Sequence, residues 1–369
     1  MRVDPPLNIE PEGRVARALP DALVAGLAAR HLSGIDGLRA ISALLVVLYH
    51  AGVPAIPAGT GVLAFFVLSG FLITRLIIAE EERSQTVSLS RFYIRRSFRI
   101  FPAFYAYWLL WVAFLLIRQH PINVPQTLSA FLYVSNYYQA LFGDPNNGLS
   151  HAWSLGVEEQ FYLLWPLAFV LLRRNERRFR VLVVLIPLLW IYRESLIFVF
   201  HVNQRYLYEA FDTRVDHILM GCLLAIALHG GHGERLWRVA CASPYMVLLT
   251  LLLLVVTVHG GRFVPVRDYR DSVEFVVTPV LCAILVAQLV AFPAHAVTSL
   301  FNWGWVRFLG KISYSIYLYQ QLVVFPAMTV FAGHAVLGVL AAVAASVLCA
   351  IGSYYLIEQP FLRLRQRFD

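Results

Sequence analysis

Long apolar runs, separated by short charged segments, dominate this sequence. They occupy residues 36–53, 59–79, 99–117, 127–142, 153–172, 181–200, 216–229, 245–259, 274–292, 306–330 and 334–357. A helix of about 20 apolar residues is long enough to cross the hydrocarbon core of a bilayer. Because lipid offers the backbone no hydrogen-bond partners, helices satisfy this requirement within a single segment. The pattern therefore predicts an all-α protein that crosses a membrane many times.

The composition supports the same class. The chain has 369 residues, of which 59% are hydrophobic and 14% are charged, whereas soluble domains carry about 25% charged residues. This excludes an ordinary soluble enzyme, a secreted disulfide scaffold and a disordered protein. The four cysteines are isolated within or beside apolar runs. They show no metal-ligand spacing, so we expect apolar packing residues and no metal site.

The run at 127–142, TLSAFLYVSNYYQALF, is short and contains Ser, Asn and Gln. We expect it to be re-entrant or interfacial, which leaves ten transmembrane helices and places both termini on one side. Arginines cluster after the second and fourth spans and at the chain end, on the side of the N-terminus. The positive-inside bias makes that side cytoplasmic. We therefore attribute the net charge of +8 to contact with the lipid bilayer and not with nucleic acid. We expect a multi-pass protein of the inner (cytoplasmic) membrane.

Three regions follow from this topology. Residues 1–34 mix prolines and charges and lack the features of a signal peptide, so we expect a cytoplasmic N-terminal extension. Residues 35–360 form the membrane domain, and 361–369 form a basic cytoplasmic tail. Glu358 lies just before Pro360, where we expect it to anchor the end of the last span.

Ionisable groups inside a bilayer are costly and therefore mark candidate sites. Arg39 and His50 are eleven residues apart in the first span, which is about 20° from three full turns and places both on one helix face. Along the axis they are ~16 Å apart, so we expect Arg39 near the cytoplasmic mouth of a cavity and a buried His50. A snorkelling arginine and a structural histidine are the alternative. Asp36 is expected to help cap this helix.

Two further segments carry polar groups toward the same region. Ser69 and Gly70 lie in FFVLSGFLIT, where the glycine would let another helix approach closely and the serine could bond toward the site. Arg96 and Arg99 are three residues apart on one face at the cytoplasmic end of the third span. Guanidinium groups suit phosphate oxygens, although lipid headgroups explain such a cluster equally well.

The segment LSHAWSLGVEEQFYLLWP contains two adjacent glutamates. His151, Glu158 and Tyr162 share one helical stripe by spacing, and a carboxylate at the start of an apolar span needs a partner or a proton. We expect Glu158 to belong to a functional site, with an ion pair to Arg214 as the alternative. Glu159 is about 100° away on the helix, so we expect surface or capping duty for it.

Polar groups recur in two later spans. Arg214 and Asp216 lie at the outer end of the sixth span, and their opposite charges predict a structural pair. Tyr314, Tyr317 and Gln320 are spaced by three residues. That spacing predicts a polar stripe that lines a cavity or a helix interface.

Taken together, these motifs resemble the acyltransferase-3 family of polytopic membrane O-acyltransferases. The resemblance covers nearly the whole chain, from about Ile35 to Phe368. It rests on DGLRA with the Arg39-x10-His50 spacing, FFVLSGF, the RxxR of Arg96 and Arg99, WSLGVEEQFY with Trp153, RVDHILMG, LGKISYSIYL and LIEQPFLR, which follow in the family's order. Each motif alone is weak, but the ordered set is specific.

The resemblance implies transfer of an acyl group, commonly acetyl, from acyl-CoA to a hydroxyl of a carbohydrate or glycosylated acceptor, such as a cell-surface polysaccharide. It makes His50 the catalytic histidine, Arg39 its motif partner, and Arg96 and Arg99 the CoA-side arginines. Glu158 takes the position of the family's carboxylate. Two departures are expected to matter: many members have histidine where this chain has Gln320, and no C-terminal esterase-like domain follows the last span.

The mechanism that we expect places the nucleotide of CoA at the cytoplasmic arginines and its pantetheine arm along the Arg39–His50 face. A neutral His50 would act as general base toward the acceptor hydroxyl, oriented by Glu158. An acyl-histidine intermediate is the competing route. A transporter or flippase for a glycan or small organic acid explains the spans equally well, although inverted repeats are not visible. A basic membrane scaffold would leave the polar groups without a purpose.

Overall fold

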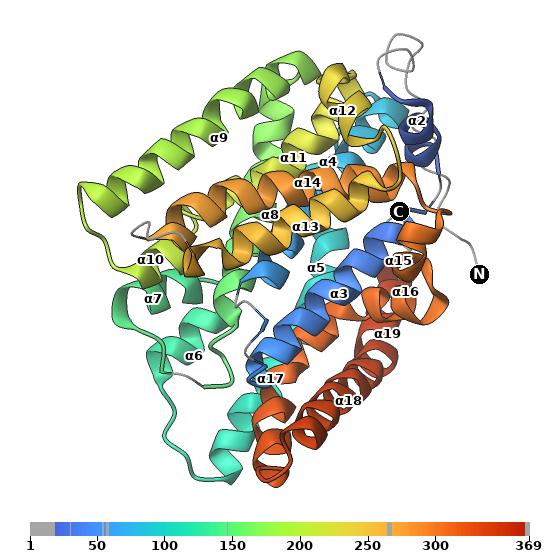
Figure 1. Cartoon of the computed structure of the whole chain (residues 1–369). Helices are drawn as coiled ribbons and strands as arrows, with labels where there is room; N and C mark the ends of the chain where they lie inside the picture. Colours follow the sequence, from blue (N-terminus) through green and yellow to red (C-terminus); the bar gives the residue numbers. More distant parts are fainter. Residues whose placement is uncertain are drawn as a thin grey trace.

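The computed structural model describes residues 19–29, 31–53, 55–56, 59–145, 147–263 and 268–365. Over these residues the chain forms helices joined by short turns, with no strand. Most of the long helices run in roughly one direction through the molecule (Figure 1). The predicted all-α architecture is therefore confirmed for this part of the chain. Of the expected N-terminal extension, the structure describes a short helix, α2 (Asp21–Leu27), and residues 1–18 lie outside the described ones.

Within the described residues, six helices are long and apolar enough to cross a membrane. They are α4 (Thr60–Ser84), α5 (Leu89–Ile117), α8 (Ala152–Leu172), α9 (Asn175–Phe198), α14 (Phe275–Ala291) with the π-helical turn Arg270–Glu274 before it, and α18 (Ala335–Ser353) continued by the π-helical turn Tyr354–Glu358 and α19 (Gln359–Arg365). A seventh span arises if α11 (Val215–Gly230) and α12 (Glu234–Ala240), bent by 103°, count as one. The protein is thus a multi-pass membrane protein, while the number ten and the cytoplasmic placement of the termini stay predictions.

The remaining apolar runs form shorter or less apolar helices. These are α3 (Ser33–His50), α13 (Met246–His259), α16 (Gly304–Lys311) and α17 (Ser313–Val330), together with the short helices α10 (Gln204–Glu209) and α15 (Ser299–Asn302). The run at 306–330 is divided between α16 and α17, with Ile312 at the junction. Division at this point lets α16 and α17 both pack against α3.

The polar run at 127–142 does not form a span. It is divided into α6 (Val124–Phe131) and α7 (Ser135–Phe142), and Tyr133 between them has a left-handed φ of 56°. An eight-residue helix is about 12 Å long, well short of the ~30 Å hydrocarbon core. The prediction that this run would not span as one helix is confirmed.

Close helix contacts depend on glycines that the sequence places at the crossing points. A Cβ on Gly70 of α4 would lie 1.9 Å from the Ile218 carbonyl oxygen of α11. Conversely, a Cβ on Gly221 would lie 1.9 Å from the Val67 oxygen. The two backbones therefore touch at a point where no side chain fits, as small residues allow in membrane helix pairs. This packing role for Gly70 is as the sequence indicated.

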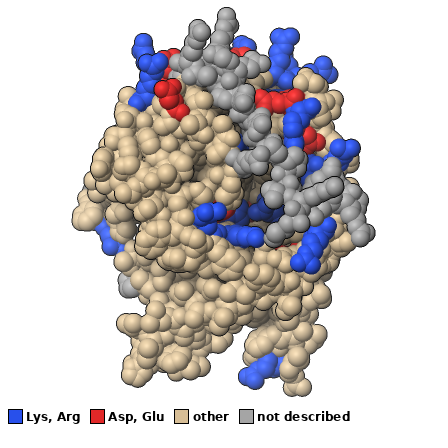
Figure 2. Space-filling model, turned by 90° about the vertical axis from the view of Figure 1, so that its right-hand side faces the viewer, with Lys and Arg blue, Asp and Glu red and all other residues tan. Residues whose placement is uncertain are grey.

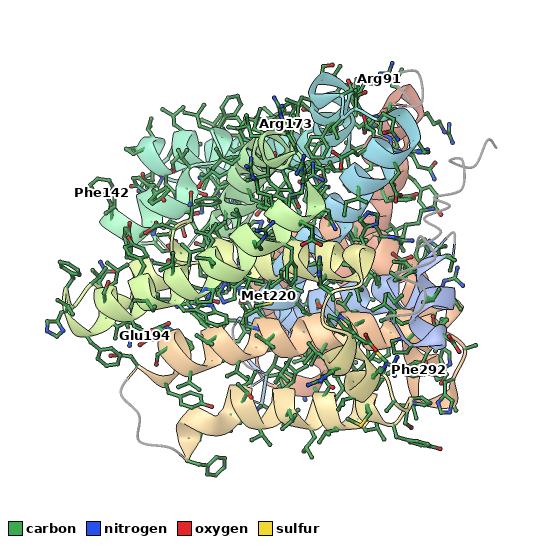
Figure 3. All side chains as sticks on the ribbon, turned by 90° about the horizontal axis from the view of Figure 1, so that it is seen from above. Arg91, Phe142, Arg173, Glu194, Met220 and Phe292 are labelled. Atoms are coloured by element: carbon green, nitrogen blue, oxygen red, sulfur yellow. The ribbon has the colours of Figure 1, made fainter. Side chains whose placement is uncertain are left out.

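Apolar side chains cover the outside of the bundle. Exposed leucines, valines and isoleucines project from α5, α9, α13 and α18, including Leu110, Ile191 and Leu348. Figure 3 shows Phe142 and Glu194 at one end of the bundle, Phe292 near the other, and Met220 between them. An apolar flank of this kind suits contact with lipid. The polar groups described below are turned inward from it.

Candidate functional site

A pocket of about 210 Å³ lies among α3, α4, α5, α8 and α17. It is lined by five cationic side chains, Arg39, Arg75, Arg96, Arg99 and Lys311, and by three carboxylates, Glu158, Glu159 and Glu358. The structure thereby brings together Arg39, Ser69, Arg96, Arg99, Glu158, Tyr162, Tyr314 and Tyr317 from the residues singled out in the sequence.

The pocket changes character along its length. Arg99 and Lys311, which line it, are exposed to solvent, whereas Ser154 and Tyr317, which also line it, are buried. Basic side chains gather in and around a hollow on the face shown in Figure 2. The pocket therefore leads from a positively charged, accessible end to a buried end lined by hydroxyl groups.

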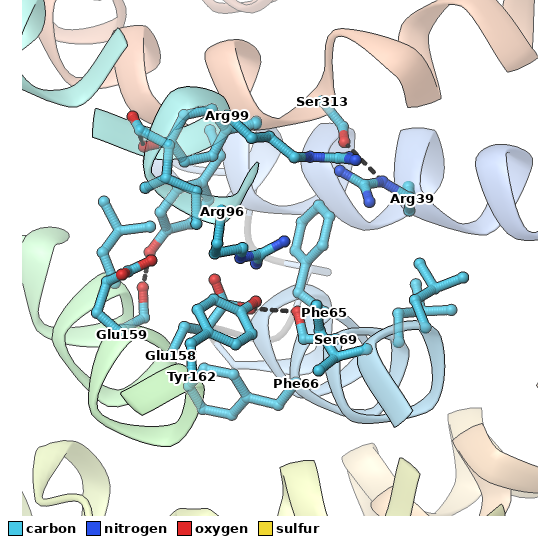
Figure 4. A pocket seen from close by; sticks show the side chains of 18 of the residues that line it. Arg39, Phe65, Phe66, Ser69, Arg96, Arg99, Glu158, Glu159, Tyr162 and Ser313 are labelled. Carbon is cyan, nitrogen blue, oxygen red and sulfur yellow. Dashed lines mark hydrogen bonds between the residues drawn. The ribbon is translucent and has the colours of Figure 1, made fainter. Parts of the chain in front are cut away.

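Three arginines converge within the pocket (Figure 4). Arg39 Nε donates to Ser313 Oγ at 3.3 Å, and the guanidinium of Arg96 lies 3.6 Å above the ring of Tyr162. The Nε of Arg96 is buried without a hydrogen-bond partner. Because the five lining cations outnumber the three carboxylates, the pocket favours an anionic ligand over a neutral one.

The carboxylates are distributed differently from the prediction. Glu158 accepts a hydrogen bond of 2.5 Å from Ser69 Oγ, so this serine bonds to a residue that lines the pocket, which is one of the roles that the sequence left open for it. Glu159 also lines the pocket, so its assignment to the surface or to a cap was wrong. The pocket wraps around this side of α8, so two residues about 100° apart both reach it. Glu358 lines the pocket as well, and accepts from Ser315 Oγ at 2.5 Å, so its role is not confined to ending a helix.

His50 lies beyond the pocket and does not line it. Its ring is exposed at the C-terminal end of α3, so the expectation of a buried imidazole was wrong. The Nδ1 atom donates to the Val46 carbonyl oxygen at 2.9 Å, and the side-chain amide of Gln321 donates to Nε2 at 3.3 Å. This arrangement leaves the proton on Nδ1 and the lone pair on Nε2.

Two side chains close the deep end of the pocket toward His50. Ser154 Oγ and Tyr317 Oη are 2.5 Å apart, and each is also within hydrogen-bond distance of the His151 carbonyl oxygen. The His151 ring lies between Tyr107 and Tyr317, at centroid distances of 5.2 and 5.6 Å, with neither ring nitrogen bonded. His151 occupies the turn before α8, where burial, with a smaller contribution from nearby His50, lowers its pKa to about 3. His151 is therefore a neutral ring packed against Tyr317 at this end of the pocket.

Arg214 and Asp216 belong to a second charged cluster, not to this pocket. Asp216 accepts hydrogen bonds from Arg193 Nη1 at 2.9 Å and from Trp190 Nε1 at 3.0 Å. The predicted Arg214–Asp216 pair is therefore wrong, because the arginine that pairs with Asp216 is Arg193. Arg214 instead lies 3.9 Å from the ring centre of Phe275, with no hydrogen bond from its guanidinium. The alternative ion pair between Arg214 and Glu158 is not formed. Arg193 lies on α9, 23 residues before Asp216 in the sequence, so the spacing of residues within one helix could not predict this pairing.

The other predicted supporting residues lie near the pocket without lining it. Asp36 is in the first turn of α3 but makes no capping hydrogen bond; it pairs with His31 at 2.8 Å. Trp153 packs edge-on against Phe66, a lining residue. Gln320 is fully buried, and neither atom of its side-chain amide has a hydrogen-bond partner. The stripe on α17 thus directs Tyr314 and Tyr317 into the pocket and Gln320 elsewhere.

Sequence reasoning missed several members of the site. Arg75, Ser154 and Lys311 line the pocket, and Gln321 holds His50. Ser154 could have been found, because it is four residues before Glu158 and therefore one turn along the same face. Lys311 is also a detectable signal as the single lysine of the chain. Arg75 follows an apolar stretch without a distinguishing pattern.

Comparison with known proteins assigns the chain to a family. The chain belongs to the acyltransferase-3 family, whose acyltransferase domain matches residues 32–357. The resemblance drawn from the ordered motifs is thereby confirmed. No solved structure matches the chain.

Two relatives of the chain are named as O-acetyltransferases. The chain is 29% identical over 323 residues to the peptidoglycan O-acetyltransferase OatA of Listeria monocytogenes, covering 80% of this chain and 50% of the relative. It is 29% identical over 326 residues to the O-acetyltransferase OatA of Staphylococcus aureus, covering 80% of this chain and 51% of the relative. The chain thus spans about half the length of these relatives.

Proposed function

We propose that this protein is an O-acetyltransferase of the cytoplasmic membrane, which takes an acyl group from acyl-CoA, most simply acetyl-CoA, and transfers it to a hydroxyl of a glycan. The observation that carries the proposal is the pocket itself. It joins an accessible cluster of cations to a buried end directed toward a histidine, within a chain of the acyltransferase-3 family.

The charge of the pocket supports a CoA thioester as donor. The nucleotide of CoA carries several phosphate charges at one end of a long, thin molecule, and its thioester is at the other. Arginine and lysine side chains bind phosphate oxygens through charge-assisted hydrogen bonds. With the phosphates at Arg99 and Lys311, which are exposed, the pantetheine arm extends past Arg39 and Glu158 toward Ser154 and Tyr317.

The hydrogen bonds of His50 support a role as general base. Its Nδ1 proton is held by the Val46 carbonyl, so Nε2 keeps the lone pair that must accept the acceptor's proton. Gln321, now bonded to Nε2, would be displaced by the incoming hydroxyl. The exposure of His50 at the end of α3 allows a bulky glycan to reach it without entering the donor pocket. Glu158 lies inside the pocket and bonds to Ser69, so we propose that it acts on the donor side and does not orient His50.

The acceptor is proposed from the relatives. One of them is named as a peptidoglycan O-acetyltransferase, and a peptidoglycan-like glycan carries hydroxyl groups outside the cytoplasmic membrane. The end of the pocket toward His50 is opposite the accessible cationic end. A donor entering from one side and an acceptor approaching from the other then meet at the histidine.

The test measures release of free CoA and formation of acetylated glycan by the purified protein with acetyl-CoA and peptidoglycan fragments. His50→Ala should fold, insert and bind CoA but show no transfer, because the base is missing. His120→Ala, which changes an exposed histidine in the turn after α5, is the matched control and should keep wild-type activity. Robust transfer by His50→Ala would refute the assignment of the base. If the thioester stays intact with every acceptor tried, the result would favour the alternative function, a transporter or flippase for a glycan or small organic acid.

A further inference from the structure

The deep end of the pocket holds two hydroxyl groups that the role of His50 leaves unexplained. Tyr317 Oη and Ser154 Oγ are 2.5 Å apart and come from different helices, α17 and α8. Tyr317 Oη is 3.1 Å from the His151 carbonyl oxygen, and Ser154 Oγ is 3.2 Å from it. One of the two hydroxyl protons lies between the two oxygens, and the other can be donated to the His151 carbonyl. The two hydroxyl oxygens are therefore close together in a place where both side chains are buried.

This pair is close to the proposed base. Gln321, whose amide lies 3.3 Å from His50 Nε2, is four residues after Tyr317 on α17. Four residues are about one helical turn, or ~6 Å along the axis. Tyr317 and Gln321 therefore project from neighbouring positions on α17, and the acceptor hydroxyl is proposed to lie between the acyl carbon beside Tyr317 and His50.

We propose that Tyr317 and Ser154 bind the carbonyl oxygen of the donor thioester and stabilise the negative charge that develops on it. The inference rests on the proposed function and adds the oxyanion-binding groups that it lacks. The thioester oxygen replaces the present acceptors of the two hydroxyl protons. Only the two O–H bonds need to rotate, because the hydroxyl oxygens are already held side by side by two helices, and such prior placement is the condition under which oxyanion donors are effective.

The step balances as follows. The acceptor oxygen forms a bond to the acyl carbon as its proton passes to His50 Nε2, and the carbonyl π electrons move onto the oxygen held by Tyr317 and Ser154. Collapse of this tetrahedral species restores the C=O bond and breaks the C–S bond. The CoA thiolate then takes the proton from the His50 imidazolium and leaves as the thiol.

Kinetics of the purified full-length protein test this assignment. Tyr317→Phe removes one hydroxyl and little volume, so kcat should fall by about 10²-fold, while the Kd for CoA, which lacks the carbonyl, stays at its wild-type value. Ser154→Ala should lower kcat in the same way. Tyr319→Phe is the matched control: it removes the hydroxyl of another buried tyrosine on α17 that does not line the pocket, and kcat should not change.

An infrared measurement separates this role from a structural one. With acetyl-CoA labelled with ¹³C at the carbonyl and bound to His50→Ala, in which transfer is blocked, the two hydrogen bonds should shift the thioester stretch to lower wavenumber. The shift should shrink when Tyr317→Phe is added. A wild-type kcat and an unchanged stretch in both hydroxyl variants would overturn the inference while leaving the proposed function standing. Failure of the wild-type protein to release CoA would instead overturn both.

Discussion

Two groups of charged side chains lie inside this helical bundle, and they are built in opposite ways. In the first, between α9 and α11, the Arg193 and Asp216 side chains are each 1% exposed and are bonded directly to one another. In the second, the pocket described above, five cations outnumber three carboxylates. The charges of Arg193 and Asp216 neutralise one another within the protein, while the pocket keeps an excess of positive charge.

The difference shows why burial of charge alone does not identify a site. Both groups would be expensive in an apolar environment without compensation. The Arg193–Asp216 pair is also bonded to Trp190 and to the Thr213 carbonyl, and its two charges cancel. The excess positive charge of the pocket has no such counter-charge among the lining residues. In the proposed function, the anionic donor supplies that counter-charge.

The largest effect should come from breaking the closed pair. Asp216→Ala leaves Arg193 buried without its counter-charge, which typically costs about 3–5 kcal/mol. Thermal unfolding in detergent should show a large loss of stability, and the fraction that remains folded should bind CoA normally. Weak binding by that folded fraction would mean that the two charged groups are coupled, against the distinction drawn here.

The second effect is on ligand binding. Arg96→Met keeps much of the side-chain volume but removes the guanidinium, and a hydrogen bond to a charged group is worth about 1.5–3 kcal/mol. The Kd for CoA should therefore rise by about 10- to 100-fold, while the unfolding temperature stays close to that of the wild type. Arg91→Met, an exposed arginine on the same helix that does not line the pocket, is the control. Equal Kd values for the two variants would remove Arg96 from the donor site.

The smallest effect should come from salt. The accessible cations at the mouth of the pocket are screened, since the Debye length falls from about 10 Å at 0.1 M to about 3 Å at 1 M salt. The Kd for CoA should rise severalfold over this range. The stability lost in Asp216→Ala should hardly depend on salt, because a buried pair is screened much less. Isothermal titration and thermal unfolding at both salt concentrations measure the two responses.

The pocket was predictable wherever its residues repeat on one helix. Arg96 with Arg99, and Glu158 with Tyr162, have spacings of three and four, and both pairs line the pocket. Such spacings place side chains on one face whatever the helix packs against. The family resemblance then predicted that residues from different helices belong to one site, which spacing within a single helix could not show.

The errors have the same physical origin. Glu159 was assigned away from the pocket because a single helix face was assumed to line it, and Arg214 was paired with Asp216 because they are neighbours in sequence. In the structure, the pocket wraps around α8, and Asp216 pairs with Arg193 from another helix. The burial predicted for His50 also failed, because the helix period gives the direction of a side chain and not what stands beside it.

The sequence by itself determined that this protein is helical, that it crosses a membrane repeatedly and that it belongs to one family, because apolar length and motif order are properties of the chain. Tertiary structure decided which charges are satisfied internally and which face a ligand. It also decided that Tyr317 meets Ser154 and that Gln321 reaches His50. Those contacts join residues more than 150 positions apart, and only the packing of helices can bring such residues within hydrogen-bond distance.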